Sequence, residues 1–359
     1  MAPIRLFNFD FHISVIADVK HILKGLFPEQ IEITEWNISG HNWVFNRAPK
    51  QVDIITQQTW SHMNESMIMA FQDKYGDYLE TFDGFIVTHT PVLCMLYEKY
   101  NKPVFLVNTC RYEQPFSWTG DLRMWQSLND CLGRLNSKGL LFAVSNNKAD
   151  QEYLKLGTGI QSLHIPSLCE YTGIQWSTNT RGPILYTNEG VVPDIQGLAR
   201  RSQMPQPFQW ADLLQRRAIV HVPYEISTMS IAEQYSAGVP LFFPTKRFLL
   251  HLWKHGGIDF QGPYARSGIY HPLVQKAVDS NYKWSFWLDR ADYYDQDNMK
   301  YIKYFDSWED LAQQISTFQE TEEDTQKRLQ WIGTRRGTVY QAWKDLFSKA
   351  FPALTGPKN

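Results

Sequence analysis

Short apolar segments alternate with helical patterns along the first half of the chain. The apolar runs that we interpret as strands or buried segments are Ile4–Phe11, Ile31–Trp36, Val52–Ile55, Gly84–Thr88, Pro103–Val107 and Leu140–Val144. The helical patterns between them cover about Ser14–Leu26, Pro91–Tyr100 and Asp121–Leu135. Buried strands separated by helices of about 10–15 residues are typical of βαβ units, so we predict a parallel sheet with helices between its strands.

The same alternation resumes in the second half, after a stretch rich in turn-forming residues. That stretch covers Ile165–Arg181, and we place the boundary between two domains there. A strand at Ile184–Thr187 and a helix at Trp210–Arg216 follow it. The chain closes with a long helix, Glu322–Phe351, whose apolar stripe consists of Ile332, Val339, Trp343, Leu346 and Phe347. The second half therefore also predicts an α/β domain.

The length of the chain fits two domains better than one. A single hydrophobic core stops growing beyond about 250–300 residues, and this chain has 359. We assign residues 1–170 to the first domain and residues 171–325 to the second. Residues 326–359 form a separate C-terminal helical segment.

Charge and cysteine content exclude several classes of function. Lys plus Arg number 35 and Asp plus Glu number 37, a net charge of −2 that does not suit binding to nucleic acid through a basic face. The N-terminal residues lack the long apolar region of a signal peptide, and no window of 18 or more apolar residues occurs, so we expect a cytoplasmic protein without a transmembrane segment. No C-x-x-C pair occurs among Cys94, Cys110, Cys131 and Cys169, which disfavours a metal or redox motif.

One segment of the second half is more informative than the rest of the chain. It begins with an apolar strand, Ala218–Val222, and continues as a helix that ends in the small-residue turn Ser236-Ala237-Gly238. A second apolar strand, Val239–Phe243, follows the turn. The pattern places one glutamate, Glu225, in the loop at the carboxyl end of the first strand, and a second, Glu233, about two turns into the helix. Ligands of open α/β sheets collect at this edge.

These two carboxylates suit a particular kind of ligand. Carboxylate oxygens accept hydrogen bonds from hydroxyl groups, and the N-terminus of the following helix attracts a phosphate. A nucleotide sugar carries both hydroxyls and phosphates. The segment therefore points to a nucleotide-sugar site.

The same residues resemble a known family. In the large retaining glycosyltransferase family that includes sucrose synthases and bacterial mannosyltransferases, a Glu-x7-Glu pair precedes a small-x-Gly-x-Pro turn. The residues that fit this pattern in order are Glu225, Glu233, Ala237, Gly238 and Pro240. In the first half, FDGFIVTHTPVLCMLYEKYNKPVFLVNT resembles the family's strand that ends in a histidine, then a helix, then a strand opening with Pro-Val. His89 lies at the position of that histidine.

The resemblance implies a GT-B fold, in which two Rossmann-like domains face each other across a cleft and the C-terminal helix returns to the first domain. It implies that Glu233 binds the ribose hydroxyls of the donor and that Glu225 meets hydroxyls of the transferred sugar. The loop over 226–229 would present amides and the hydroxyls of Ser227 and Thr228 to the diphosphate, with Met229 at its end. His89 would reach the transferred sugar or its phosphate from the other domain.

Two features of this sequence depart from the family, and one of them is the absence of the usual Gly-rich loop after the first Glu. The family usually places an Arg and a Lys in the first loop of its second domain, whereas this loop reads YTNEGVVPDIQG and contains neither. Replacement cations are available in Lys246 and Arg247, which directly follow the strand Val239–Phe243, and in Arg200 and Arg201. We therefore treat Lys246 and Arg247 as candidate phosphate ligands.

We accordingly predict a glycosyltransferase that moves a sugar from a UDP- or GDP-linked donor to a glycan or glycoconjugate hydroxyl. A retaining reaction is favoured because Glu225 occupies the position that the family requires. An inverting reaction needs a base on the first domain, and Asp10 and His12 at the end of the first strand are its candidates. A nucleotide-sugar epimerase and a non-catalytic carbohydrate-binding protein are the alternatives.

No metal ion or other cofactor is expected. The segment Asp295-Gln296-Asp297 mimics the Asp-x-Asp metal motif of the other large glycosyltransferase fold. It lies in the polar tract ADYYDQDN rather than at the end of an apolar strand, so we interpret it as a surface loop. The expected ligands are the nucleotide sugar and its acceptor alone.

Overall fold

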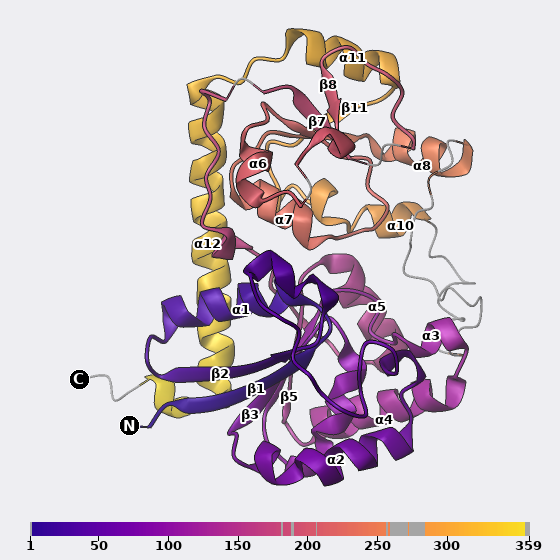
Figure 1. The fold of residues 1–359 in the computed structure, drawn as a ribbon, viewed down its shortest axis with the longest axis vertical. Helices are drawn as coiled ribbons and strands as arrows, with labels where there is room; N and C mark the ends of the chain where they lie inside the picture. Colours follow the sequence, from indigo (N-terminus) through magenta and orange to yellow (C-terminus); the bar gives the residue numbers. More distant parts are fainter. Residues whose placement is uncertain are drawn as a thin grey trace. The chain divides into compact units, whose positions relative to one another are not determined.

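The computed structural model divides the chain into two compact α/β units (Figure 1). It describes residues 2–180, 182–187, 190–205, 207–255, 258, 272 and 284–355. Unit 1 contains Met1–Ser167 and Val339–Asn359, and unit 2 contains Leu168–Gly262 and Lys283–Thr338. The long helix α12 (Glu322–Ala350) contributes to both units. Residues 326–338, which we expected to group with the first domain, belong to unit 2.

Unit 1 is built on a six-stranded parallel sheet. Its strands are β1 (Ile4–Asp10), β2 (Ile31–Asn37), β3 (Gly84–Thr88), β4 (Val104–Asn108), β5 (Leu141–Ser145) and β6 (Leu163–His164). They lie in the order β2-β1-β3-β4-β5-β6, and every pairing is parallel. The direction of strand addition reverses between β1 and β3, because β2 lies on one side of β1 and β3 lies on the other. This reversal is the switch point at which open sheets of this kind bind ligands.

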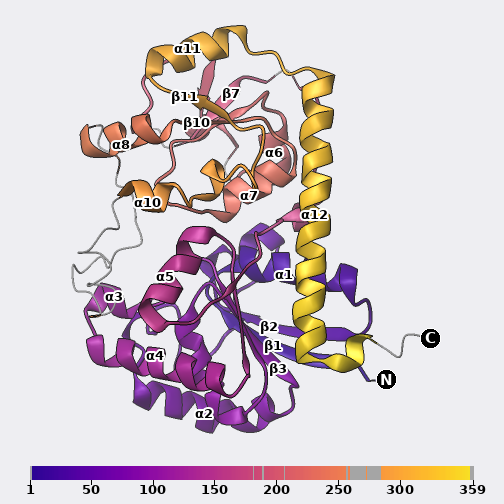
Figure 2. The ribbon, with the colours of Figure 1, turned by 180° about the vertical axis from the view of Figure 1, so that it is seen from behind.

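Helices cover both faces of this sheet, as parallel strands require (Figures 1 and 2). They are α1 (Ile13–Leu26), α2 (Glu65–Glu80), α3 (Phe116–Thr119), α4 (Leu122–Ser137) and α5 (Lys148–Thr158). The last part of α12 also packs on unit 1, where Phe347 stacks on Phe105 of β4 with ring centroids 4.1 Å apart. The stripe predicted for this helix is confirmed, because all five of its apolar side chains are buried.

One local prediction for unit 1 is wrong. The helix predicted over Pro91–Tyr100 is a pair of 3-10 helices, η3 (Pro91–Leu96) and η4 (Glu98–Tyr100), which end where Asn101 adopts a left-handed φ of 54°. The segment is apolar on nearly all sides instead of along one stripe, so its pattern could not distinguish the two helix types. Of the two interpretations of the apolar run Val52–Ile55, the buried segment holds, because Val52 and Ile55 are buried and the left-handed backbone of Ile54, with a φ of 74°, is not that of a strand.

Unit 2 is built on a five-stranded parallel sheet with the order β11-β10-β9-β7-β8. Its strands are β7 (Ile184–Tyr186), β8 (Leu198–Arg200), β9 (Ile219–Val220), β10 (Leu241–Pro244) and β11 (Lys303–Phe305). Its helices besides α12 include α6 (Trp210–Leu214), α7 (Met229–Ser236), α8 (Lys246–His255), α10 (Trp284–Leu288) and α11 (Trp308–Thr317). The order of the strands reverses between β7 and β9. Unit 2 thus has its own switch point, at the carboxyl ends of those two strands.

The segment singled out from the sequence lies at this second switch point. The segment consists of strand β9, helix α7 and strand β10, in that order. Helix α7 begins at Met229, later than expected, so Glu225 lies in the loop before it and Glu233 lies in its second turn. Gly238 ends the helix with a left-handed φ of 81°, a conformation that glycine adopts without a steric penalty.

Candidate functional site

Two histidines meet at the switch point of unit 1. His12 follows β1 and His89 follows β3, so the two strands that flank the reversal carry them to the same edge of the sheet. The centroids of their imidazole rings are 4.5 Å apart. His89 has a left-handed φ of 58°, which is uncommon for a residue with a side chain and is found most often in turns and at functional sites.

Asp10 supports the turn that carries His12. Its side chain is fully buried, and its Oδ1 accepts hydrogen bonds from the backbone amides of Phe11 at 2.6 Å and His12 at 3.3 Å. Its Oδ2 accepts a hydrogen bond from the hydroxyl of Thr88. Burial raises the pKa of Asp10 to about 7, because the ionised carboxylate loses its contact with water. These hydrogen bonds give Asp10 a positioning role behind His12.

Both imidazoles are held in the neutral form at neutral pH. Burial lowers the pKa of His12 to about 4, and the nearby His41 adds to this effect. Burial also lowers the pKa of His89 well below its ordinary value, with smaller contributions from His12 and from Arg111. The Nδ1 atom of His12 is buried without a hydrogen-bond partner among the described residues, whereas Nδ1 of His89 lies 3.3 Å from Oγ1 of Thr109. A neutral imidazole has a lone pair that can accept a proton, and a pKa this far below neutral makes each ring a weak base until a bound substrate or anion raises that pKa.

Further charged residues follow β4 and β5 at the same edge, and the sequence analysis did not single them out. Arg111 and Glu113 are buried after β4, and Asp150 is buried near the start of α5. Burial raises the pKa of Glu113 to about 7, while Arg111 acts in the opposite direction. The signal that would have found them is their position directly after predicted apolar strands.

The switch point of unit 2 also carries a histidine. His221 follows β9, and its Nδ1 lies 3.2 Å from Oγ1 of Thr187, which follows β7. Its Nε2 lies 2.7 Å from Oε1 of Gln234 on α7. Burial lowers the pKa of His221 to about 4, so the ring is neutral at neutral pH. This chain of contacts links the two strands at the reversal to α7, and no motif in the sequence indicated it.

Glu225 lies in the loop between β9 and α7. Its Oε1 accepts a hydrogen bond from the backbone amide of Ile226 at 3.0 Å, and its backbone carbonyl accepts one from the hydroxyl of Tyr293 at 3.1 Å. The preceding residue, Tyr224, leaves 51% of its surface exposed. An exposed aromatic ring beside a carboxylate offers both a stacking surface and a hydrogen-bond acceptor to a ligand at this edge.

Glu233 is more enclosed than a solvated helix position. Only 8% of its surface is exposed. One carboxylate oxygen accepts a hydrogen bond from the hydroxyl of Tyr171, and the other accepts one from the indole nitrogen of Trp210 at 3.1 Å. A ribose hydroxyl at this position would share a carboxylate oxygen with one of these donors or displace it, because each carboxylate oxygen can accept two hydrogen bonds.

The loop predicted to face the diphosphate has its hydroxyls engaged within unit 2. The hydroxyl of Ser227 donates to the buried carboxylate of Asp292. Thr228 immediately precedes α7, and its Oγ1 lies 3.2 Å from Oγ of Ser230. Met229 is buried as the first residue of the helix. The amides of the first turn of α7 remain the part of this loop that suits an anion.

The candidate phosphate cations are also paired with acidic residues. Lys246, the first residue of α8, forms an ion pair with Asp289, and Arg247 forms one with Asp306. A phosphate would have to compete with these carboxylates. Of the loop YTNEGVVPDIQG, Asn188 and Glu189 lie outside the described residues.

The described part of the chain contains no group of three or more His, Cys, Asp or Glu side chains arranged to hold a metal ion. Asp295, which we interpreted as part of a surface loop, is buried, and its Oδ1 accepts a hydrogen bond from the backbone amide of Asp297 at 3.1 Å. Within the described residues, no helix combines the length and the apolar character needed to span a bilayer.

Comparisons with known proteins give structural likenesses and no sequence match. No protein-family model matches the chain, and no curated protein matches it by sequence. A crystal structure of HepE from Anabaena in complex with UDP is similar, with a TM-score of 0.48 and 10% identity over 96% of this chain and 100% of that chain. The kitacinnamycin glycotransferase has a TM-score of 0.44 and 10% identity over 98% of this chain and 99% of its own. The calicheamicin glycosyltransferase CalG4 has a TM-score of 0.41 and 9% identity over 98% of this chain and 100% of its own.

Proposed function

We propose that the protein transfers a sugar from a nucleoside-diphosphate sugar to a hydroxyl acceptor, without a metal ion. The observation that carries the proposal is the pair of neutral imidazoles, His12 and His89, at the switch point of unit 1. A hydroxyl acceptor must lose a proton when it attacks, and a neutral imidazole at the ligand-binding edge of a sheet can take that proton.

Unit 2 supplies the groups that we assign to the donor. The switch point between β7 and β9 is the expected place for the nucleotide, and Tyr224 and Glu225 lie in the loop that follows β9. Glu225 would accept hydrogen bonds from the transferred sugar. The first amides of α7 would face the diphosphate, with Lys246 and Arg247 as the cations that neutralise it. Glu233 would accept hydrogen bonds from the ribose hydroxyls, beside Tyr171 and Trp210 or in place of one of them.

The chemistry then follows one of two courses. In an inverting reaction the acceptor oxygen forms a bond to the anomeric carbon while the bond to the diphosphate breaks, and the acceptor proton passes to an imidazole. His12 is the base we assign, because its turn is positioned by Asp10 and its Nδ1 has no hydrogen-bond partner in the described part of the chain. In a retaining reaction the departing phosphate oxygen takes the proton, and Glu225 lies beside the sugar. The imidazole pair supports the inverting course, and the resemblance of the Glu-x7-Glu segment supports the retaining one.

The first experiment measures which nucleotide stabilises the protein. Thermal denaturation is followed with UDP, GDP, ADP, CMP and dTDP, with and without EDTA. A ligand at 100 times its dissociation constant adds about 2.7 kcal/mol to the free energy of unfolding, which shifts the melting temperature by several degrees. A shift with one nucleotide that EDTA does not change supports a metal-independent donor site.

The second experiment uses that nucleotide's sugar conjugates and an acceptor panel. Proton NMR of the product's anomeric centre distinguishes inversion from retention. Turnover of the donor without any acceptor would favour an epimerase. Binding of free sugars with no binding of any nucleotide would favour a carbohydrate-binding protein.

A further inference from the structure

A separate pocket lies in unit 1 beside the end of strand β2. Its volume is about 380 Å³, within the range of small-molecule sites. It is lined by Glu35, Asn37, Asn42, Arg47, Ala48, Pro49, Lys50 and Gln51. Nothing in the proposed transfer reaction uses these residues.

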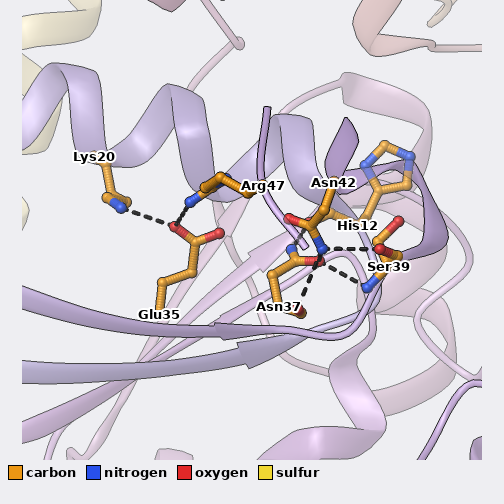
Figure 3. A network of polar contacts seen from close by, with 7 residues as sticks. All are labelled: His12, Lys20, Glu35, Asn37, Ser39, Asn42 and Arg47. Atoms are coloured by element: carbon orange, nitrogen blue, oxygen red, sulfur yellow. Dashed lines mark hydrogen bonds and ion pairs between the residues drawn. The ribbon is translucent and has the colours of Figure 1, made fainter. Parts of the chain in front are cut away.

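The walls of the pocket are fixed by hydrogen bonds at the end of β2 (Figure 3). The Oδ1 of Asn37 accepts from the backbone amide of Ser39 at 2.9 Å and from Nδ2 of Asn42 at 3.0 Å. The backbone amide of Lys50 donates to the carbonyl of Asn37 at 2.8 Å, and that of Arg47 donates to the carbonyl of Asn42 at 3.1 Å. The loop that forms one side of the pocket is thus tied to the end of the strand at Asn37 and to Asn42, whose side chain is itself bonded to Asn37, so a ligand meets groups that are already in place.

Glu35 contributes an unsatisfied acceptor to the pocket. Only 5% of its side chain is exposed. Its Oε2 accepts hydrogen bonds from Lys20 at 2.8 Å and Arg47 at 3.1 Å, and Figure 3 shows both cations directed at that one oxygen. Its Oε1 is buried without a partner among the described residues. Buried carboxylate oxygens are normally hydrogen-bonded. We therefore infer that a ligand donates the hydrogen bond to this oxygen, since no described residue does.

The charged residues around the pocket indicate which other chemical group a ligand would carry. Arg47 and Lys50 outnumber the single carboxylate of the lining, and Lys20 adds a third cation next to Glu35. An excess of cations favours an anionic ligand, and the planar guanidinium of Arg47 suits a carboxylate or a phosphate. Two cations already neutralise Glu35. An uncharged hydroxyl is therefore a better hydrogen-bond donor to its Oε1 than an ammonium group.

We propose that this pocket binds a small anionic sugar, with its phosphate or carboxylate at Arg47 and Lys50 and a hydroxyl at Oε1 of Glu35. The volume holds roughly a dozen water molecules at about 30 Å³ each, which suits a monosaccharide with one acidic group. The site uses unit 1 residues only and requires no nucleotide. The proposal of this binding site is therefore independent of the proposed glycosyl transfer.

The test is isothermal titration calorimetry on the full-length protein with glucose 6-phosphate, glucuronate, glucose and inorganic phosphate. We expect glucose 6-phosphate or glucuronate to bind at least about tenfold more tightly than glucose or phosphate. Only an anionic sugar carries both an acidic group for the cations and a hydroxyl for Glu35. The arm that binds identifies phosphate or carboxylate as the anion. The proposal would be overturned if neither anionic sugar bound, or if glucose or phosphate bound as tightly as the tighter of the two anionic sugars.

Two variants assign the binding to the pocket. Arg47→Gln and Lys50→Gln each remove one cation, and each should weaken binding by roughly tenfold or more. Arg123→Gln is the matched control, because Arg123 is an exposed arginine of α4 that pairs with Glu65 outside the pocket. It should leave the affinity within about twofold of the wild-type value. Unchanged affinity in both pocket variants would place the ligand elsewhere and refute the assignment, and circular dichroism of each variant verifies that it is folded.

Discussion

The imidazole of His12 lies 4.5 Å from that of His89, measured between ring centroids, although the two residues are far apart in the sequence. They meet because β1 and β3 are neighbours in the sheet and both end at the same edge. Neither ring carries a charge at neutral pH, since burial lowers both pKa values. The pair therefore combines proximity with the protonation state that a base needs.

The first prediction concerns this pair. His12→Gln should lower the turnover of donor and acceptor by about 10²–10⁴-fold, the usual contribution of a general base, while nucleotide affinity stays within about twofold. His89→Asn should lower turnover without unfolding the protein, because asparagine tolerates the left-handed conformation of this position. Steady-state kinetics and calorimetry with the nucleotide separate the two effects. Parallel losses of turnover and nucleotide affinity would argue against a role in proton transfer.

The second prediction concerns the pH dependence of stability. The folded protein holds the Asp10 proton up to about pH 7, whereas an unfolded aspartate releases its proton near pH 4. Between these values the folded state binds more protons, so Asp10 makes the free energy of unfolding fall as the pH rises. His12 acts in the opposite direction, because its pKa is about 4 in the folded protein and about 6.5 in the unfolded chain.

In the wild-type protein these two contributions oppose each other between about pH 4 and pH 6.5. Asp10→Asn removes the first of them, so the melting temperature of this variant should rise more steeply with pH over that window than that of the wild type. His12→Gln should produce the opposite change in slope. Thermal denaturation at half-unit pH steps measures both, and curves parallel to the wild type would show that the two groups titrate normally.

The third prediction distinguishes two roles for Glu233. If Glu233 binds the ribose directly, Glu233→Gln should weaken nucleotide binding by about 10- to 150-fold, the range for a hydrogen bond to a charged group. Trp210→Phe removes the indole donor that occupies one carboxylate oxygen, so direct binding predicts equal or tighter nucleotide affinity in this variant. If Glu233 acts only by holding Trp210, both substitutions should weaken binding. Calorimetry with the nucleotide that stabilises the protein decides between these outcomes.

The fourth prediction concerns the turn after α7. Gly238 has a φ of 81°, and a Cβ atom there would lie 2.9 Å from Cδ2 of Leu329. Gly238→Ala should therefore lower the free energy of unfolding by about 1–2 kcal/mol, the usual penalty of the left-handed conformation, with any displacement of Leu329 adding to it. Gly333→Ala is the control within α12, where an added Cβ meets no atom within 4 Å. It should raise stability by about 0.5–1 kcal/mol through helix propensity, and equal effects in both variants would contradict the prediction.

Much of the architecture could be predicted from the sequence because it depends on local patterns. Gly84–Thr88 has a continuous apolar run up to Val87, as expected of a strand buried on both faces, and it is β3 of the sheet. The stripe of α12 repeats at helical spacing and is buried. The prediction failed at Pro91–Tyr100, because a segment that is apolar on nearly all sides has no periodicity that distinguishes an α-helix from a 3-10 helix.

The candidate site was predictable in part for the same reason. Residues that follow apolar strands gather at the carboxyl edge of a parallel sheet, and this rule identified Asp10, His12, His89 and Glu225. Arg111 follows β4 and carries the same signal, whereas His221 lies inside the predicted strand Ala218–Val222 and only the shorter strand β9 places it at the edge. Which strands are neighbours, and hence which of these residues meet, required the strand order.

The sequence by itself determined the class of the fold, because the spacing of the apolar residues indicates which segments are buried strands and which are helices with one buried face. Only the tertiary structure decided which polar groups are engaged. Glu233 accepts hydrogen bonds from Tyr171 and Trp210, and Lys246 pairs with Asp289, partners that lie far away along the chain. The physical reason is that hydrogen bonds and ion pairs act over a few ångströms in space, whatever the separation of their residues in sequence.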